Sequence, residues 1–161
     1  MRFTQSQVEE LLKKAEPQKV DEYTFFDPGY SILQLREKFP DLFYDQSWYD
    51  DQEFAKLTEE PRERTIRIIP DSNNKTFEEQ KAMLRKDEEV TKARQLAMLS
   101  VLLKRSGEKD IQEMVDGWVR CEEKTTGGLR VGLDWRDGGL VVDSWDVNRL
   151  DRVWLSSVRT S

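Results

Sequence analysis

The N-terminal part of the chain carries apolar residues at helical spacing, interrupted by turn signals. Thr4 and Gln7 form a possible capping box at the start of a first helix. The apolar residues that follow recur on one face: Val8, Leu11, Leu12 and Ala15. Residues 30–39 predict a second, short helix that ends before Pro40.

Two further helical patterns occupy the middle of the chain. Thr76 and Glu79 form the clearest capping box and predict a helix that continues to Leu84. Residues 88–105 predict a longer helix, for which Gly107 is the natural C-cap. Because this helix is apolar around much of its circumference, we expect it at the centre of the core.

Strand patterns dominate the last quarter of the chain. An earlier strand is predicted over residues 64–69, which alternate and end at Pro70. The later strand-like runs are residues 118–122, 129–133, 140–143 and 153–159, and the Gly-Gly pairs at 127–128 and 138–139 predict hairpin turns between them. N-terminal and central helices followed by a C-terminal antiparallel sheet with a polar surface loop predict an α+β fold. A length of 161 residues suits a single domain.

Residues 42–54 combine aromatic side chains with aspartates. Such a segment can bind a sugar or a cation, or its rings can anchor a coil against the core. We favour packing, because large aromatic side chains are usually buried.

The composition argues against several classes of function. The net charge of −6 disfavours binding of duplex nucleic acid, whose phosphates attract Lys and Arg. The chain has no histidine and one cysteine, Cys121, so His-based nucleophile chemistry, an intrachain disulfide and a cysteine zinc cluster are excluded. Cys121 lies in an alternating strand and is expected to be buried and inert. We therefore expect no cofactor.

The sequence shows no signal for export or membrane insertion. The N-terminal segment lacks the apolar run of a signal peptide, and no segment is long and apolar enough to span a membrane. A reducing cytoplasm is the default expectation, and export by an unmarked route is left open.

Aspartates gather late in the chain: Asp134, Asp137, Asp143, Asp146 and Asp151. Two of them can act as an acid and base pair in a hydrolase, and several can bind calcium. Arginines at positions 136, 149 and 152 lie among them, so surface ion pairing is the simpler interpretation.

Several segments together resemble one protein family. They are residues 48–49, 74–80, 93–95, 128–133, 138–142, 144–149 and 153–159. In this order they are similar to the variable proteins of diversity-generating retroelements, especially those of uncultivated small-genome bacteria and archaea. The resemblance covers residues 42–161.

The resemblance implies a C-type-lectin-like fold of the formylglycine-generating-enzyme type, used for binding. It implies a core over residues 42–161, preceded by a helical N-terminal extension over residues 1–41. In this family a reverse transcriptase rewrites codons near the 3′ end at adenines, here over a variable region at about residues 134–158. Formylglycine-generating enzymes use paired cysteines, so the lone Cys121 argues against their activity.

The diversified ligand-binding surface implied by the resemblance is a set of nine residues: Asp143, Ser144, Asp146, Val147, Asn148, Leu150, Asp151, Arg152 and Trp154. Trp145 and Arg149 are implied to be scaffold residues. The family tends to have a small residue, commonly Gly, where Trp154 stands.

We therefore expect a protein without enzymatic activity that binds a protein ligand through this surface. A fixed protein–protein interaction or assembly module of the same fold is the alternative. A hydrolase that uses the late aspartates is less favoured. The sequence leaves the identity of the ligand and the oligomeric state open.

Overall fold

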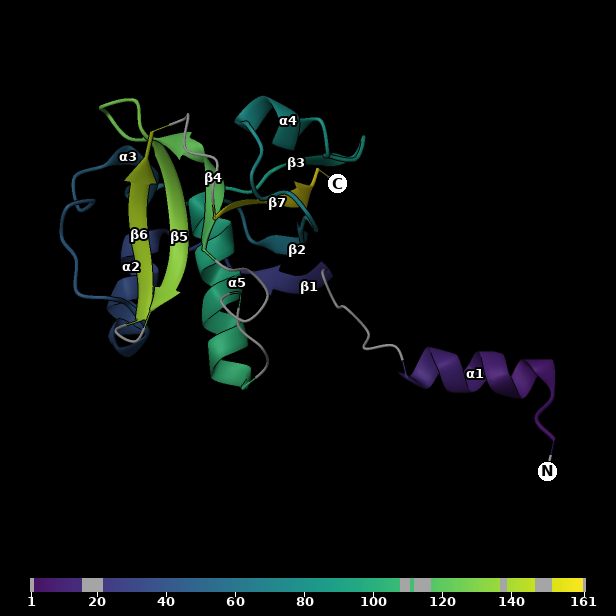
Figure 1. Ribbon diagram of the computed structural model, residues 1–161. Helices are drawn as coiled ribbons and strands as arrows, with labels where there is room; N and C mark the ends of the chain where they lie inside the picture. The colour runs from purple at the N-terminus through teal and green to yellow at the C-terminus, as the bar shows by residue number, and fades with distance from the viewer. Residues whose placement is uncertain are drawn as a thin grey trace.

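The computed structural model describes residues 2–15, 22–107, 111, 117–136, 139–146 and 152–160. Its helices and strands follow in this order (Figure 1): α1 (Gln5–Ala15), β1 (Glu22–Asp27), α2 (Ile32–Lys38), the 3-10 helix η1 (Pro40–Leu42), α3 (Glu53–Lys56), β2 (Arg62–Ile68), α4 (Phe77–Lys81), β3 (Glu88–Val90), α5 (Ala93–Ser106), β4 (Trp118–Lys124), β5 (Arg130–Arg136), β6 (Gly139–Trp145) and β7 (Val153–Arg159). The chain is thus a mixed α+β protein.

The last strand, β7, lies in the middle of a seven-stranded sheet. The strand order is β1-β2-β7-β4-β5-β6, and β3 also pairs with β7. The pairing of β7 is antiparallel with β2 and β3 but parallel with β4. The prediction of a purely antiparallel, C-terminal sheet is therefore wrong: β1 and β2 belong to the N-terminal half, and β7 enters beside β4 instead of extending the β4–β5–β6 meander.

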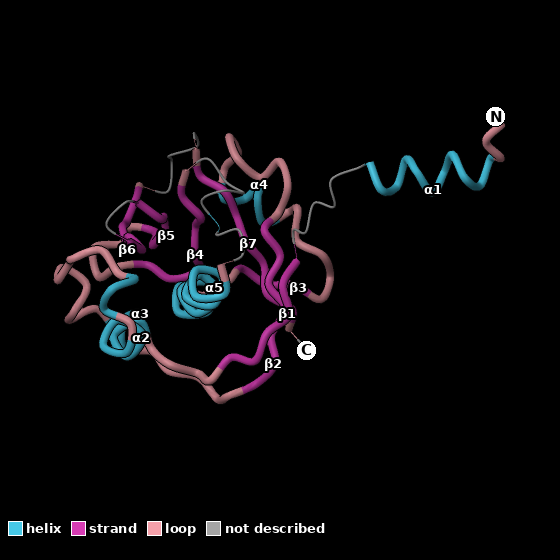
Figure 2. Tube along the Cα trace, turned by 90° about the horizontal axis from the view of Figure 1, so that it is seen from below, coloured by secondary structure: helices cyan, strands magenta, loops and turns pink. Residues whose placement is uncertain are grey.

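Helix α5 lies inside the curve of the sheet, on the same side as α2 and α3 (Figure 2). Its residues 93–101 are all buried, which confirms the prediction of a central helix. The sheet supplies alternate residues of three strands to the same core: Val119, Cys121, Val131, Leu133, Leu140 and Val142.

The start of the central helix differs from the prediction. Residues 88–90 form strand β3 instead of the first helical turn, because their backbone pairs with β7. The Glu88 carboxylate accepts hydrogen bonds from Arg67 at 2.6 and 2.9 Å and from the Ser157 hydroxyl at 2.6 Å. Burial alone would raise the pKa of Glu88, but these bonds lower it to about 2.

Residues 22–41 belong to the core and not to a helical extension. Strand β1 pairs with β2 along its whole length, and Ile32 and Leu35 of α2 are fully buried in the main apolar cluster. The predicted boundary at residue 42 is therefore too late. Of the described residues in this predicted extension, residues 2–15, which contain α1, stand apart from the rest of the molecule (Figure 1).

The aromatic segment packs as predicted and also covers the edge of the sheet. Phe43, Tyr49 and Phe54 are buried in the main cluster. The Gln46 side-chain amide accepts from Val142 N–H at 3.0 Å and donates to Val142 O at 3.1 Å, so it occupies the free edge of β6. Such covering prevents an edge strand from pairing with another chain.

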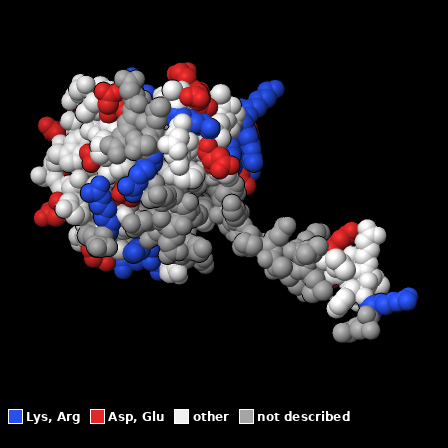
Figure 3. All heavy atoms as spheres, in the orientation of Figure 1, with Lys and Arg blue, Asp and Glu red and all other residues white. Residues whose placement is uncertain are grey.

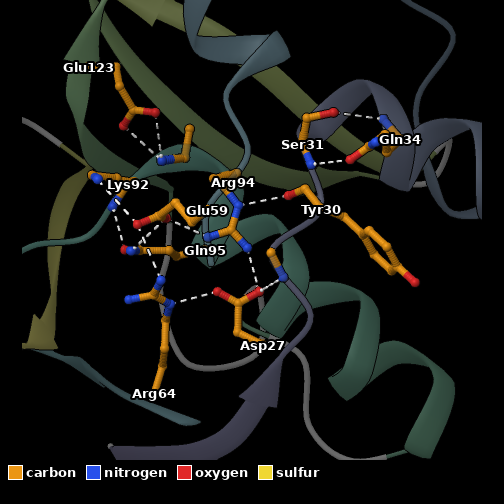
Figure 4. Close-up of polar contacts among 12 residues, drawn as sticks. Asp27, Tyr30, Ser31, Gln34, Glu59, Arg64, Lys92, Arg94, Gln95 and Glu123 are labelled. Atoms are coloured by element: carbon orange, nitrogen blue, oxygen red, sulfur yellow. Dashed lines mark hydrogen bonds and ion pairs between the residues drawn. The ribbon is translucent and has the colours of Figure 1, made fainter. Parts of the chain in front are cut away.

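A buried ionic network joins β1, β2, α5 and the segment before β2 (Figure 4). Its centre is Arg94, whose side chain is fully buried and donates to Asp27, to Glu59 and, at 2.7 Å, to Tyr30 O. Arg64 adds a 2.6 Å bond to Asp27. Burial alone would raise the pKa values of Asp27 and Glu59, but the hydrogen bonds and charges of Arg94, Arg64 and their other neighbours together outweigh it and lower both.

We predict that Arg94→Met lowers the free energy of unfolding by about 3–5 kcal/mol, because it leaves buried carboxylates short of a partner. Chemical denaturation of the full chain measures the change. The matched control is Arg105→Met on the same helix, whose ion pair with Asp41 joins two side chains that are 52% and 61% exposed. That control should cost less than about 1 kcal/mol. Equal losses for the two variants would contradict the assigned role of the network.

Candidate ligand-binding surface

Strand register separates two faces of the β4–β5–β6 meander. Val119, Leu133 and Val142 pair in one row and contact the core beneath α5. Because side chains alternate along a strand, the neighbouring row points to the opposite side. We call this side the outer face, and it comprises Trp118, Arg120, Arg130, Gly132, Asp134, Arg136, Val141, Asp143 and Trp145.

A tryptophan pair occupies the centre of the outer face. The rings of Trp118 and Trp145 meet at a centroid distance of 5.1 Å and an angle of 71°, an edge-to-face arrangement. Gly132 lies beneath them: a Cβ added there would be 3.7 Å from the Trp145 ring and 3.9 Å from the Trp118 ring. The guanidinium of Arg136 lies 5.0 Å from the centre of the Trp118 ring, in cation–π geometry.

A second cationic group lies at the other end of the outer face. The guanidinium carbons of Arg120 and Arg130 are 5.5 and 4.2 Å from the centre of the Phe77 ring. Burial lowers the pKa of both arginines, and the charge of Arg130 lowers that of Arg120 further. Arg120, Trp118 and Val141 are buried. The accessible side chains of the outer face are therefore those of Arg130, Asp134, Arg136, Asp143 and Trp145.

The structure separates the predicted variable residues. Asp143 lies on the outer face, partly buried, with Asp146 exposed just beyond β6 and Arg152 exposed just before β7. Ser144 pairs with the core residue Val131 and therefore lies on the opposite face. Trp154 is partly buried and packs against the main core, so it does not join the exposed set. The remaining predicted residues lie outside the described residues: Val147, Asn148, Leu150 and Asp151.

The backbone before β7 is strained where it meets β4. Arg152 has a φ of 59°, which is uncommon for a residue other than glycine. Its carbonyl oxygen accepts from Trp118 N–H at 2.8 Å. A Cβ at Gly117 would lie 2.1 Å from that oxygen, so only glycine fits there. Such strain is concentrated at functional sites.

The late aspartates that the structure describes do not gather into a metal-binding group, and burial raises the pKa of Asp134. Asp134 pairs with Arg136 at 3.3 Å, and the Asp143 carboxylate accepts from Ser144 N–H at 2.8 Å. Asp137 and Asp151 lie outside the described residues. Within the part of the chain that is described, no three His, Cys, Asp or Glu side chains are placed to hold a metal ion. Cys121 is buried, and burial raises the pKa of its thiol well above its usual value, as expected for an inert cysteine.

Glu123 is a titratable group that the sequence pattern did not single out. Its carboxylate accepts from Ala93 N–H at 2.8 and 3.1 Å, at the first turn of α5. Burial raises the pKa of Glu123 to about 7, although the Ala93 bond opposes this change. A perturbed pKa can mark a catalytic group. Here the carboxylate is bonded to the start of a core helix, which favours a structural role.

Comparison with protein-family models, with curated proteins and with solved structures found no match. Among the helices that are described, none is long and apolar enough to cross a membrane. The protein is accordingly classified by its own architecture: a mixed α+β protein with an aromatic and charged outer face on a central sheet.

We predict that Gly132→Val separates the Trp118–Trp145 pair and destabilises the fold by about 1–3 kcal/mol through overpacking. Near-ultraviolet circular dichroism and denaturation measure the two effects. Gly127→Val is the matched control, because a Cβ there meets nothing closer than 3.7 Å and the residue is exposed. A Gly132→Val protein with an unchanged tryptophan spectrum would refute the assigned packing.

The raised pKa of Glu123 predicts a pH dependence of stability. The folded state binds more protons than the unfolded state between the usual glutamate pKa of 4.5 and about 7, so this carboxyl contributes stability that is lost as the pH rises through that window. We expect the difference in the free energy of unfolding between Glu123→Gln and the unmodified protein to shift in favour of Glu123→Gln as the pH rises from 5 to 8. Urea denaturation at both values measures this difference. A difference that does not change with pH would show that Glu123 titrates normally.

Proposed function

We propose that the chain is a binding protein without enzymatic activity, whose protein ligand contacts the outer face and the residues that connect β6 to β7. The observation that carries this proposal is the partly exposed Trp145, which packs against the buried Trp118 and lies on the same face as Arg130 and Arg136. Tryptophan and arginine are the residues that most often dominate binding energy at protein interfaces. Asp143 of the implied variable set lies on the same face.

Strands β6 and β7 flank the implied variable residues, and side chains of both strands are buried in the core. This arrangement supports a surface whose exposed residues can change while the scaffold stays constant. Leu140 and Val142 of β6 and Val153 and Leu155 of β7 are all buried, with at most 2% exposure. Asp146 and Arg152, at the ends of the connection, are exposed. Substitution at exposed positions of this kind usually changes stability by less than about 0.5 kcal/mol. Diversification by a retroelement is therefore physically compatible with the fold.

A C-type-lectin-like scaffold is part of the proposal. The arrangement that supports it is the mixed sheet, in which the final strand joins strands from both halves of the chain. Binding is favoured over hydrolysis because Asp134 and Asp143 each engage a neighbouring donor. The net charge of −6 argues for a ligand other than nucleic acid, and the single, buried cysteine fits a reducing cytoplasm.

Sequencing of the DNA that flanks the gene tests this function directly. We expect a reverse-transcriptase gene and an imperfect repeat of the codons for residues 135–158 that differs almost only at adenines. The codons of buried Val142 and Leu155 serve as the internal control and should be identical in both copies. Flanking DNA with neither feature would remove diversification and leave a fixed interaction module.

A further inference from the structure

A groove opens between helix α2 and the aromatic segment that follows it. Its volume is about 720 Å³, which lies within the usual range of pockets that take a ligand. We call it the α2 groove, and the lining residues that matter most are Leu33, Glu37, Pro40, Phe43, Tyr44 and Asp45. None of its lining residues belongs to the outer face, so this site is independent of the proposed function.

The two walls of the α2 groove are fixed in place. Arg36 Nη1 donates to Gln46 O at 2.9 Å and to the Asp50 carboxylate at 2.7 Å, which ties α2 to the opposite wall. That wall is in turn fixed to the sheet, because Tyr44 N–H donates to Leu140 O at 3.0 Å. The groove is therefore preformed, and a ligand that enters it does not have to order a loop.

Two carboxylates of the groove are available to a ligand. Glu37 and Asp45 are exposed, and among the residues that the structure describes they have no hydrogen-bond or ion-pair partner. Arg36 also lines the groove, but its charge is already paired with that of Asp50. Figure 3 shows Asp and Glu among uncharged residues along the left margin of the molecule, where Figure 1 draws the segment between α2 and α3. The groove therefore presents uncompensated negative charge.

Aromatic and apolar side chains surround these charges. Tyr44 lines the groove and is 44% exposed, whereas Phe43 and Tyr49 of the same segment are buried. Leu33 and Pro40 add apolar surface on the side of α2. An aromatic ring attracts a cation to its face, and an apolar wall can take the alkyl stem of a lysine or arginine.

We infer that the α2 groove binds an arginine or lysine side chain of a basic protein segment. The cationic head is held by Glu37 and Asp45 and contacts the ring of Tyr44. The alkyl stem lies along Leu33 and Pro40. The charge of the ligand thus complements the charge that the groove leaves uncompensated.

A sugar is the other ligand that the sequence of the aromatic segment allows. It would stack on Tyr44 and donate hydrogen bonds to the carboxylates. It would leave the negative charges of Glu37 and Asp45 uncompensated, so a cationic side chain fits the groove better.

Nuclear magnetic resonance of the isotope-labelled full chain tests the inference. The probe is a capped pentapeptide with one arginine between two pairs of glycines. It should shift the backbone amide signals of residues 33–50, and binding should weaken as the salt concentration rises, because exposed charges are screened. The same peptide with citrulline, which keeps the shape of arginine but lacks its charge, should bind at least about fivefold more weakly.

Variants of the groove separate its charges from its ring. Glu37→Gln/Asp45→Asn should weaken binding of the arginine peptide about fivefold to tenfold. Tyr44→Leu should weaken it about twofold to fivefold. The matched control is Glu60→Gln/Asp87→Asn, which removes the same two charges at exposed positions outside the groove and should bind normally.

Three results would overturn the inference: no shifts in residues 33–50, equal binding of the citrulline peptide, or equal losses in Glu37→Gln/Asp45→Asn and the control. Shifts produced by methyl glucoside and not by the arginine peptide would also overturn it and assign the groove to a sugar.

Discussion

The fold depends on one buried cation. Arg94 lies at the first turn of α5 and holds Asp27 at the end of β1 and Glu59 just before β2. These contacts fix the central helix against the sheet edge that the N-terminal half supplies. Without them, β1 and β2 would contact α5 mainly through apolar side chains, which specify position less strictly than a set of directed bonds. The network therefore sets how the two halves of the chain meet.

Strand β7 joins the strands of the N-terminal half to the β4–β5–β6 meander. With α5 fixed on one side of the sheet, β7 pairs with β2 on one edge and with β4 on the other. The core side of β4–β5–β6 is then filled by α5, and the other side is free to carry tryptophan, arginine and aspartate. Gly132 lies beneath the two indole rings, where a Cβ would already be in van der Waals contact with both, so a larger side chain there would push against the pair.

Local pattern predicted β7 and the central helix α5, but it indicated neither strand β1 nor helix α3, and it did not provide the long-range contacts. Strand β7 has the predicted bounds, Val153–Arg159, because strict alternation and flanking polar residues mark it. The sequence pattern places the residues of β3 in the helix that follows, since three residues carry too little pattern to oppose a strong helical run. Arg94 and Asp27 are 67 residues apart, and nothing in their neighbourhoods marks them as partners. The pairing of Trp118 with Trp145 likewise depends on register, which sequence spacing does not provide.

The same geometry limits which implied variable residues can change freely. Trp154 packs against the core, so its replacement by a small side chain would create a cavity. Such a replacement lowers the free energy of unfolding by about 3–5 kcal/mol for a fully buried tryptophan, and by somewhat less for this partly buried one. At Arg152 the φ of 59° favours Gly, Asn and Asp over β-branched residues. Asp143 and Asp146 carry neither restriction. Under the proposed diversification, Asp143 and Asp146 at the end of β6 should therefore vary more than Trp154, because the packing of the scaffold limits which side chains can change.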